Sequence, residues 1–114
     1  HLNDNSNCKL DNFCEMVART AEIMDVKNLG IGSDLCLNQP DEIVEWMRNG
    51  TWTKKKVYGE GTANNVGFPE QPSWFKDARG FKNIESGLRK IGFSSDEING
   101  ILGNNWYNFY KGIN

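Results

Sequence analysis

Histidine and cysteine are scarce in this chain, which limits the metal and nucleophile chemistry that it can hold. The only histidine is His1, and the three cysteines (Cys8, Cys14 and Cys36) are irregularly spaced, with no Cys-x-x-Cys pair. These counts disfavour both a structural zinc site and a secreted disulfide scaffold. His1 with Asp4 could in principle reach a metal, but we interpret this histidine as a residue without a functional role in the polar segment that opens the chain. No Ser-His-Asp or Cys-His arrangement can be built around it.

The sequence also lacks an excess of one charge and a long apolar run. Its net charge is −2 and its isoelectric point about 5.4, so it lacks the excess of positive charge that is typical of nucleic-acid-binding proteins. No apolar stretch approaches the roughly 20 residues that span a bilayer. The chain opens with His-Leu-Asn-Asp-Asn-Ser-Asn, which is polar apart from one leucine, so we expect no signal peptide. The compartment and a possible homo-oligomeric state are left open.

Aromatic residues, in contrast, are plentiful. The chain has four tryptophans, six phenylalanines and three tyrosines among 114 residues. A chain this short buries a smaller share of its surface than a large domain does, so its core is expected to be thin. We therefore expect some of these rings to pack against something outside this sequence.

The first third of the chain predicts a helix followed by a short strand. Apolar residues recur at helical spacing over residues 11–25, where Asp11 is placed as the N-cap. Over residues 29–33, Leu29 and Ile31 alternate with glycines, and Asp34 follows. Glycine at alternate positions permits close backbone approach, so we predict a short buried strand that ends at this carboxylate.

The remainder predicts a long irregular segment and then closing helices. Residues 35–82 are punctuated by glycine and proline, apart from one helix that starts at Pro40 and ends at Gly50. Helices are predicted over residues 83–112, with a stop at Gly92 and a capping box formed by Ser94 and Glu97. A single strand cannot make a sheet. We therefore predict that residues 1–114 are one segment of a larger α/β structure, mostly helical with one short buried strand.

Asp34 is the strongest candidate for chemistry. A carboxylate at the end of a buried strand, before a long loop, lies where barrel enzymes place catalytic groups, and it could accept and return a proton. The alternative is an ordinary turn or helix-capping aspartate. Cys36 could line the same site or be a small buried residue. Residues 59–61 (Gly-Glu-Gly) do not match a phosphate-binding loop. For the tryptophans, core packing is preferred over ligand stacking.

Two segments together resemble the membrane (renal) dipeptidase family. Leu29-Gly30-Ile31-Gly32-Ser33-Asp34 is similar to the Gly-[Ile/Leu]-Gly-[Ser/Thr]-Asp stretch on that family's last barrel strand. The run from Phe81 through Gly92, Ser94, Glu97-Ile98 and Gly103 to Asn105-Trp106 is similar to its closing helices, which end in Gly-x-Asn-Trp. The order and separation of the two segments agree with the family, and the similarity covers about residues 8–112.

The resemblance implies the C-terminal portion of a (β/α)₈ TIM barrel of the metal-dependent amidohydrolase superfamily. Such hydrolases use two zinc ions to activate water against the peptide bond of a dipeptide. In the family, the aspartate that matches Asp34 is assigned proton transfer and contact with the amino end of the substrate. The family's zinc ligands all lie before the matched region, so none is expected in this segment.

Two departures from the family concern the substrate. The strand motif often continues as Asp-Phe-Asp-Gly, whereas here it is Asp34-Leu35-Cys36-Leu37, and the loop that follows is longer than in the animal enzymes. The substrate preference is therefore left open. Two rival hypotheses also stand: another hydrolase or lyase on the same barrel, and a non-enzymatic helical module that binds a partner through its aromatic residues. For the leading hypothesis, the partners are the rest of the barrel and the dipeptide, and the segment alone is expected to be inactive.

Overall fold

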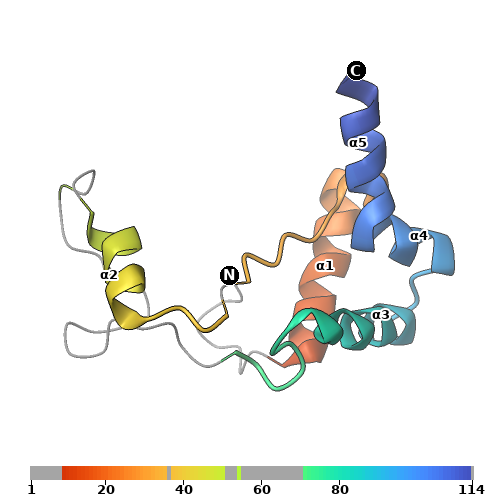
Figure 1. The fold of residues 1–114 in the computed structure, drawn as a ribbon. Helices are drawn as coiled ribbons and strands as arrows, with labels where there is room; N and C mark the ends of the chain where they lie inside the picture. The colour runs from red at the N-terminus through yellow and green to blue at the C-terminus, as the bar shows by residue number, and fades with distance from the viewer. Residues whose placement is uncertain (1–8, 36, 51–53, 55–70, 114) are drawn as a thin grey trace. The chain divides into compact units, whose positions relative to one another are not determined.

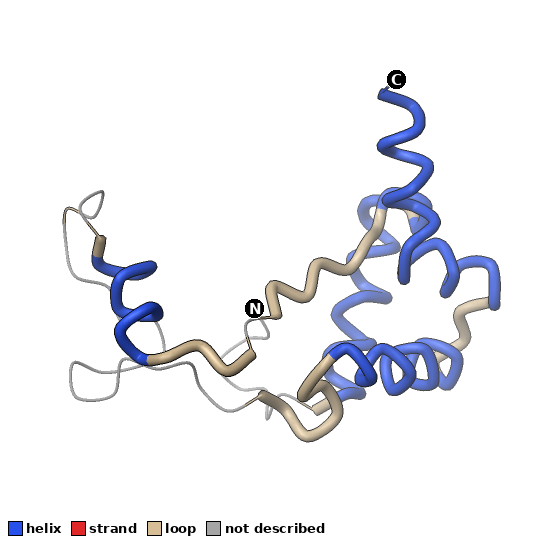
Figure 2. Tube along the Cα trace, in the orientation of Figure 1, coloured by secondary structure: helices blue, strands red, loops and turns tan. Residues whose placement is uncertain are grey.

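A computed structural model describes residues 9–35, 37–50, 54 and 71–113 of the chain. The described residues are mostly helical and include no strand (Figures 1 and 2). Two compact units are present. The first combines residues 1–33 with 72–114, and the second is formed by residues 34–71. No helix in the described part is both long enough and apolar enough to cross a membrane.

Helix α1 opens the first unit and spans Leu10–Met24, close to the predicted residues 11–25. Asp11 is not its N-cap. Lys9 holds that position without a side-chain cap, and the Asp11 carboxylate instead lies 3.2 Å from the ammonium group of Lys90. The prediction was wrong at this residue because the N-cap lies two residues earlier, which leaves the aspartate side chain available to pair with another helix. Both groups of this ion pair are well exposed, so it adds little stability.

Helix α3, Phe81–Lys90, is joined to α4, Ser95–Asn99, by a short connection whose backbone groups are largely hydrogen bonded. Gly92 has φ 109°, and the N–H groups of Gly92 and Phe93 donate to the carbonyls of Arg89 and Leu88, the two bonds of a Schellman motif. The predicted capping box follows directly, since Ser94 and Glu97 bond to each other's backbone N–H groups. The connection therefore ends one helix and starts the next without a free loop.

The chain then passes through one wide turn, η3 (Gly100–Asn104), into the last helix, α5 (Asn105–Ile113). The chain is kinked at Gly103, because the backbone leaves helical values at this glycine (φ 177°, ψ −40°). The break redirects the chain, so that Asn105 and Trp106 begin a helix of their own.

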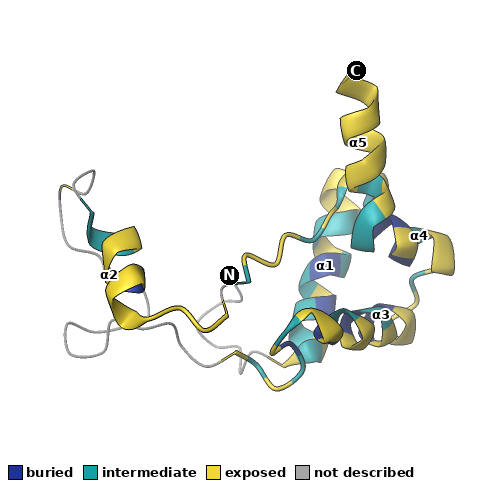
Figure 3. Ribbon diagram, in the orientation of Figure 1, coloured by how far each residue is buried: buried dark blue, intermediate teal, exposed yellow. Residues whose placement is uncertain are grey.

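The core of the first unit lies where α1 and α3 pack against the start of the closing turn (Figure 3). Its buried apolar side chains come from α1 (Cys14, Val17), α3 (Ile84, Leu88), α4 and η3 (Ile98, Ile101), together with Phe75. Gly87 permits the close contact of α1 with α3, because a Cβ at this position would lie 2.6 Å from the Cys14 sulfur. Met24, the last residue of α1, is half exposed.

The predicted buried strand over residues 29–33 is not formed. After the short 3₁₀ turn η1 (Val26–Asn28), these residues form no strand; Leu29 and Ile31 are half-buried, and Gly30, Gly32 and Ser33 are exposed. The physical reason is that a strand needs backbone hydrogen bonds to a neighbouring strand. No such neighbour exists among the residues that the structure describes.

The second unit contains helix α2, Asp41–Asn49, close to the predicted position. Asp41 and Glu42 occupy its first turn, where carboxylates favour the positive end of the helix dipole, and Gly50 is its C-cap. Val44 is buried, whereas Trp46 is 61% exposed, so the apolar residues of this helix are only partly covered.

Candidate functional site

Asp34 is the first residue of the second unit. It is exposed and has a left-handed backbone conformation, with φ 47°. This conformation is uncommon outside glycine, although aspartate tolerates it better than most residues do. Among the described residues, no group of three or more histidine, cysteine, aspartate or glutamate side chains could hold a metal ion. The described part of the chain therefore offers no ligand set that fits zinc.

Several other residues singled out from the sequence lie outside the described part: His1, Asp4, Cys8, Cys36, Trp52 and residues 59–61. Cys14, the one cysteine among the described residues, is fully buried between α1 and α3. Burial raises the pKa of its thiol above the usual range, the Asp11 carboxylate adds to this shift, and Lys90 opposes it. Since the thiolate is the reactive form, Cys14 is a packing residue and not a nucleophile.

The described tryptophans of the first unit contact other aromatic rings. Trp74 lies against Phe13, with ring centroids 5.3 Å apart, and also contacts Phe75. Trp106 stacks on Tyr110, with centroids 6.0 Å apart and an interplanar angle of 20°. Core packing was predicted for both, but Trp106 is 42% exposed, so the prediction does not hold for this residue, which also makes a specific hydrogen bond.

The side chain of Asn105 ties the start of α5 to the segment after α1. Its Nδ2 group donates to the carbonyl of Val26 (2.9 Å) and to the carbonyl of Leu29 (2.7 Å). Gly100 leaves room for this amide, because a Cβ there would lie 2.8 Å from the Asn105 Oδ1 atom. One side chain thus satisfies two backbone carbonyls that lie 76 and 79 positions away in the sequence.

Trp106 fixes the next part of the same segment. Its Nε1 group donates to the Ile31 carbonyl (3.3 Å), and the Ile31 N–H donates to the Ile101 carbonyl (3.2 Å). The indole lies directly against Gly30, where a Cβ would come within 2.7 Å of Cε2 and 2.8 Å of Cδ1. Only glycine fits here without displacing the ring. Residues 29–31 are therefore held by the start of the closing helix.

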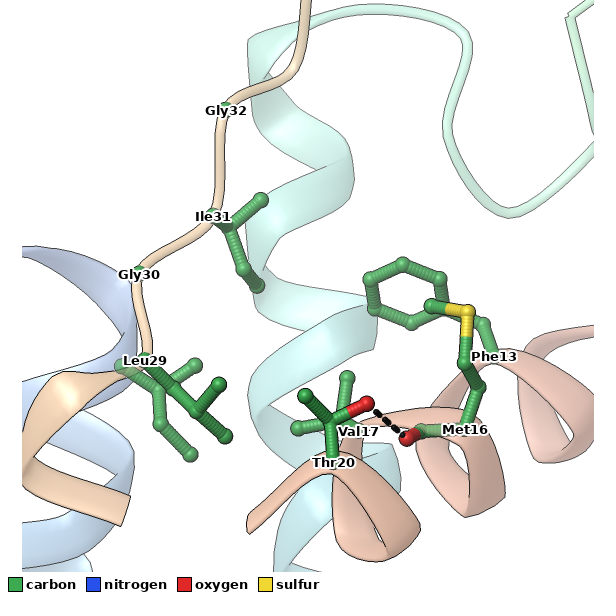
Figure 4. Close-up of a pocket in the computed structure, with 9 residues that line it drawn as sticks. Phe13, Met16, Val17, Thr20, Leu29, Gly30, Ile31 and Gly32 are labelled. Carbon is green, nitrogen blue, oxygen red and sulfur yellow. Dashed lines mark hydrogen bonds between the residues drawn. The ribbon is translucent and has the colours of Figure 1, made fainter. Parts of the chain in front are cut away.

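An apolar hollow of about 240 Å³ lies between this segment and α1. In Figure 4 the side chains of Leu29 and Ile31 point toward the α1 residues that line its other side. Those residues are Phe13, Met16, Val17 and Thr20, with Ile101 completing the lining. The Thr20 hydroxyl donates to the Met16 carbonyl (2.8 Å), so its hydrogen is already used within the helix. The hollow suits an apolar group and has no acid, base or charged group in its lining.

The sequence placed Asn105 only within a resemblance and predicted core packing for Trp106, so neither residue was assigned a role in a site. Local spacing could not have revealed one, because their partners lie more than 70 residues away. Gly30 is the one sequence feature that points to this contact, because a glycine in an extended segment permits another group to approach the backbone closely. The structure identifies the approaching group as the Trp106 indole.

Comparison with known proteins adds no relative: no protein-family model, no curated protein and no solved structure matches the chain.

Proposed function

We propose that this chain is the C-terminal part of a zinc-dependent dipeptidase built on a (β/α)₈ barrel, as the resemblance implies. The observation that supports the proposal is that the two resembling segments meet. Asn105 and Trp106, from the closing Asn-Trp motif, bond to the carbonyls of Leu29 and Ile31, from the strand motif.

In this proposal Asp34 acts in proton transfer and contacts the amino end of the dipeptide. Asp34 lies three positions after Ile31, whose carbonyl accepts from Trp106, and in this proposal the rest of the barrel fixes the carboxylate. The zinc ligands come from the part of the parent protein that precedes this chain. Zinc supplies the activated water when bound, so the segment alone has no hydrolytic chemistry.

The first test is to read the coding sequence that precedes this chain. The proposal expects a barrel with a His-x-Asp pair, a glutamate and two later histidines, in that order. An upstream sequence without such a ligand set would refute it. An arginine able to hold a substrate carboxylate would favour a dipeptide, and its absence would favour another hydrolase or lyase on the same barrel.

The second test is Asp34→Asn in the intact parent. We expect kcat for dipeptide hydrolysis to fall by about 10²-fold or more while two zinc ions per chain remain bound, because proton transfer is lost and the metal site is untouched. Asp41→Asn, at an exposed aspartate of α2, is the matched control and should leave kcat unchanged. Unchanged activity in Asp34→Asn, or stoichiometric zinc with turnover in the 114-residue chain alone, would contradict the proposal.

A second candidate function is a non-enzymatic interaction module. The observation that favours it is the exposure of the large apolar side chains along α5, namely Trp106, Tyr107, Phe109, Tyr110 and Ile113. A helix with this much exposed aromatic surface has the composition of an interface. The upstream sequence separates the two candidates, because a module of this kind needs no metal ligands before it.

A further inference from the structure

We draw no further inference here: the strongest candidate, the exposed apolar face of α5 formed by Trp106, Tyr107, Phe109, Tyr110 and Ile113, already carries the second candidate function, and nothing in the described part of the structure shows what covers it.

Discussion

At the scale of single residues, Asn105 makes the most consequential contacts in the first unit. Its amide bonds to two carbonyls, Val26 and Leu29, from a part-buried position. If the amide is removed, both carbonyls lose a donor in a place that water reaches only in part. Leaving polar groups without partners costs more than the average hydrogen bond contributes.

We predict that Asn105→Ala lowers the free energy of unfolding by about 1–3 kcal/mol, because two backbone carbonyls lose their donor. Chemical denaturation followed by circular dichroism measures the change. Asn104→Ala, at an exposed neighbouring asparagine, is the matched control and should change stability by less than about 0.5 kcal/mol. Equal effects of the two substitutions would show that the Asn105 bonds do not hold the segment.

The residues also show which features the sequence could reveal. The capping box of Ser94 and Glu97 and the stop at Gly92 were predictable because each depends on residues three or four positions apart. Asn105 was not, because its side-chain bonds join segments at opposite ends of the sequence. Asp11 was misplaced as an N-cap because the sequence alone does not show that α1 begins at Leu10.

At the scale of elements, the contact between α1 and α3 depends on a glycine. Gly87 lies inside α3, where alanine would be favoured by about 1 kcal/mol on helix propensity alone. A Cβ there would lie 2.6 Å from the Cys14 sulfur and 3.2 Å from Leu10 Cγ. The sulfur is fully buried and has no free space to move into, so the steric cost outweighs the propensity gain.

We therefore predict that Gly87→Ala destabilises the chain by about 1–2 kcal/mol, as overpacking of a core does. In a Cys14→Ala background the same change should be neutral or stabilising by up to about 1 kcal/mol, since the clash is removed and the propensity gain remains. A double-mutant cycle of unfolding free energies measures the coupling. Additive effects of the two substitutions would contradict this view of the contact.

Among the elements, the helices were predictable and the strand was not, for one physical reason. A helix satisfies its backbone within its own segment, so the spacing in α1, α2 and α3 was sufficient to locate them. A strand depends on a neighbour that the local sequence does not specify. Residues 29–33 have the composition of a strand, but in this chain their bonds go to the turn and helix that contain Ile101, Asn105 and Trp106.

At the scale of the whole molecule, the plentiful aromatic residues are only partly used in the described core. Phe75 is buried, but Phe109 is 59% exposed and Tyr110 is 60% exposed on α5 (Figure 3). The expectation that some rings pack on something outside this sequence stays a prediction. The barrel also stays a prediction, because the chain itself supplies no strand among its described residues.

We predict that the isolated chain is marginally stable or self-associates, since the other described residues of the first unit leave the apolar surface of α5 exposed. Its melting temperature should rise with protein concentration, as mass action requires. Phe109→Ser should weaken this dependence more than Ile91→Ser, which removes an exposed apolar side chain from the end of α3. A sharp melt of a monomer above about 60 °C, independent of concentration, would argue against this view.

The bonds from Asn105 have a further consequence for how this chain tolerates change. They close the first unit by joining its two ends, with residues 34–71 lying between them in the sequence as a unit of their own. The entropy of closing such a loop grows only with the logarithm of its length, and each doubling costs about 0.6 kcal/mol. Evolution can therefore lengthen, shorten or replace this stretch at little thermodynamic cost. Kinship with other proteins should be sought in the paired ends, with a gap of any size allowed between them.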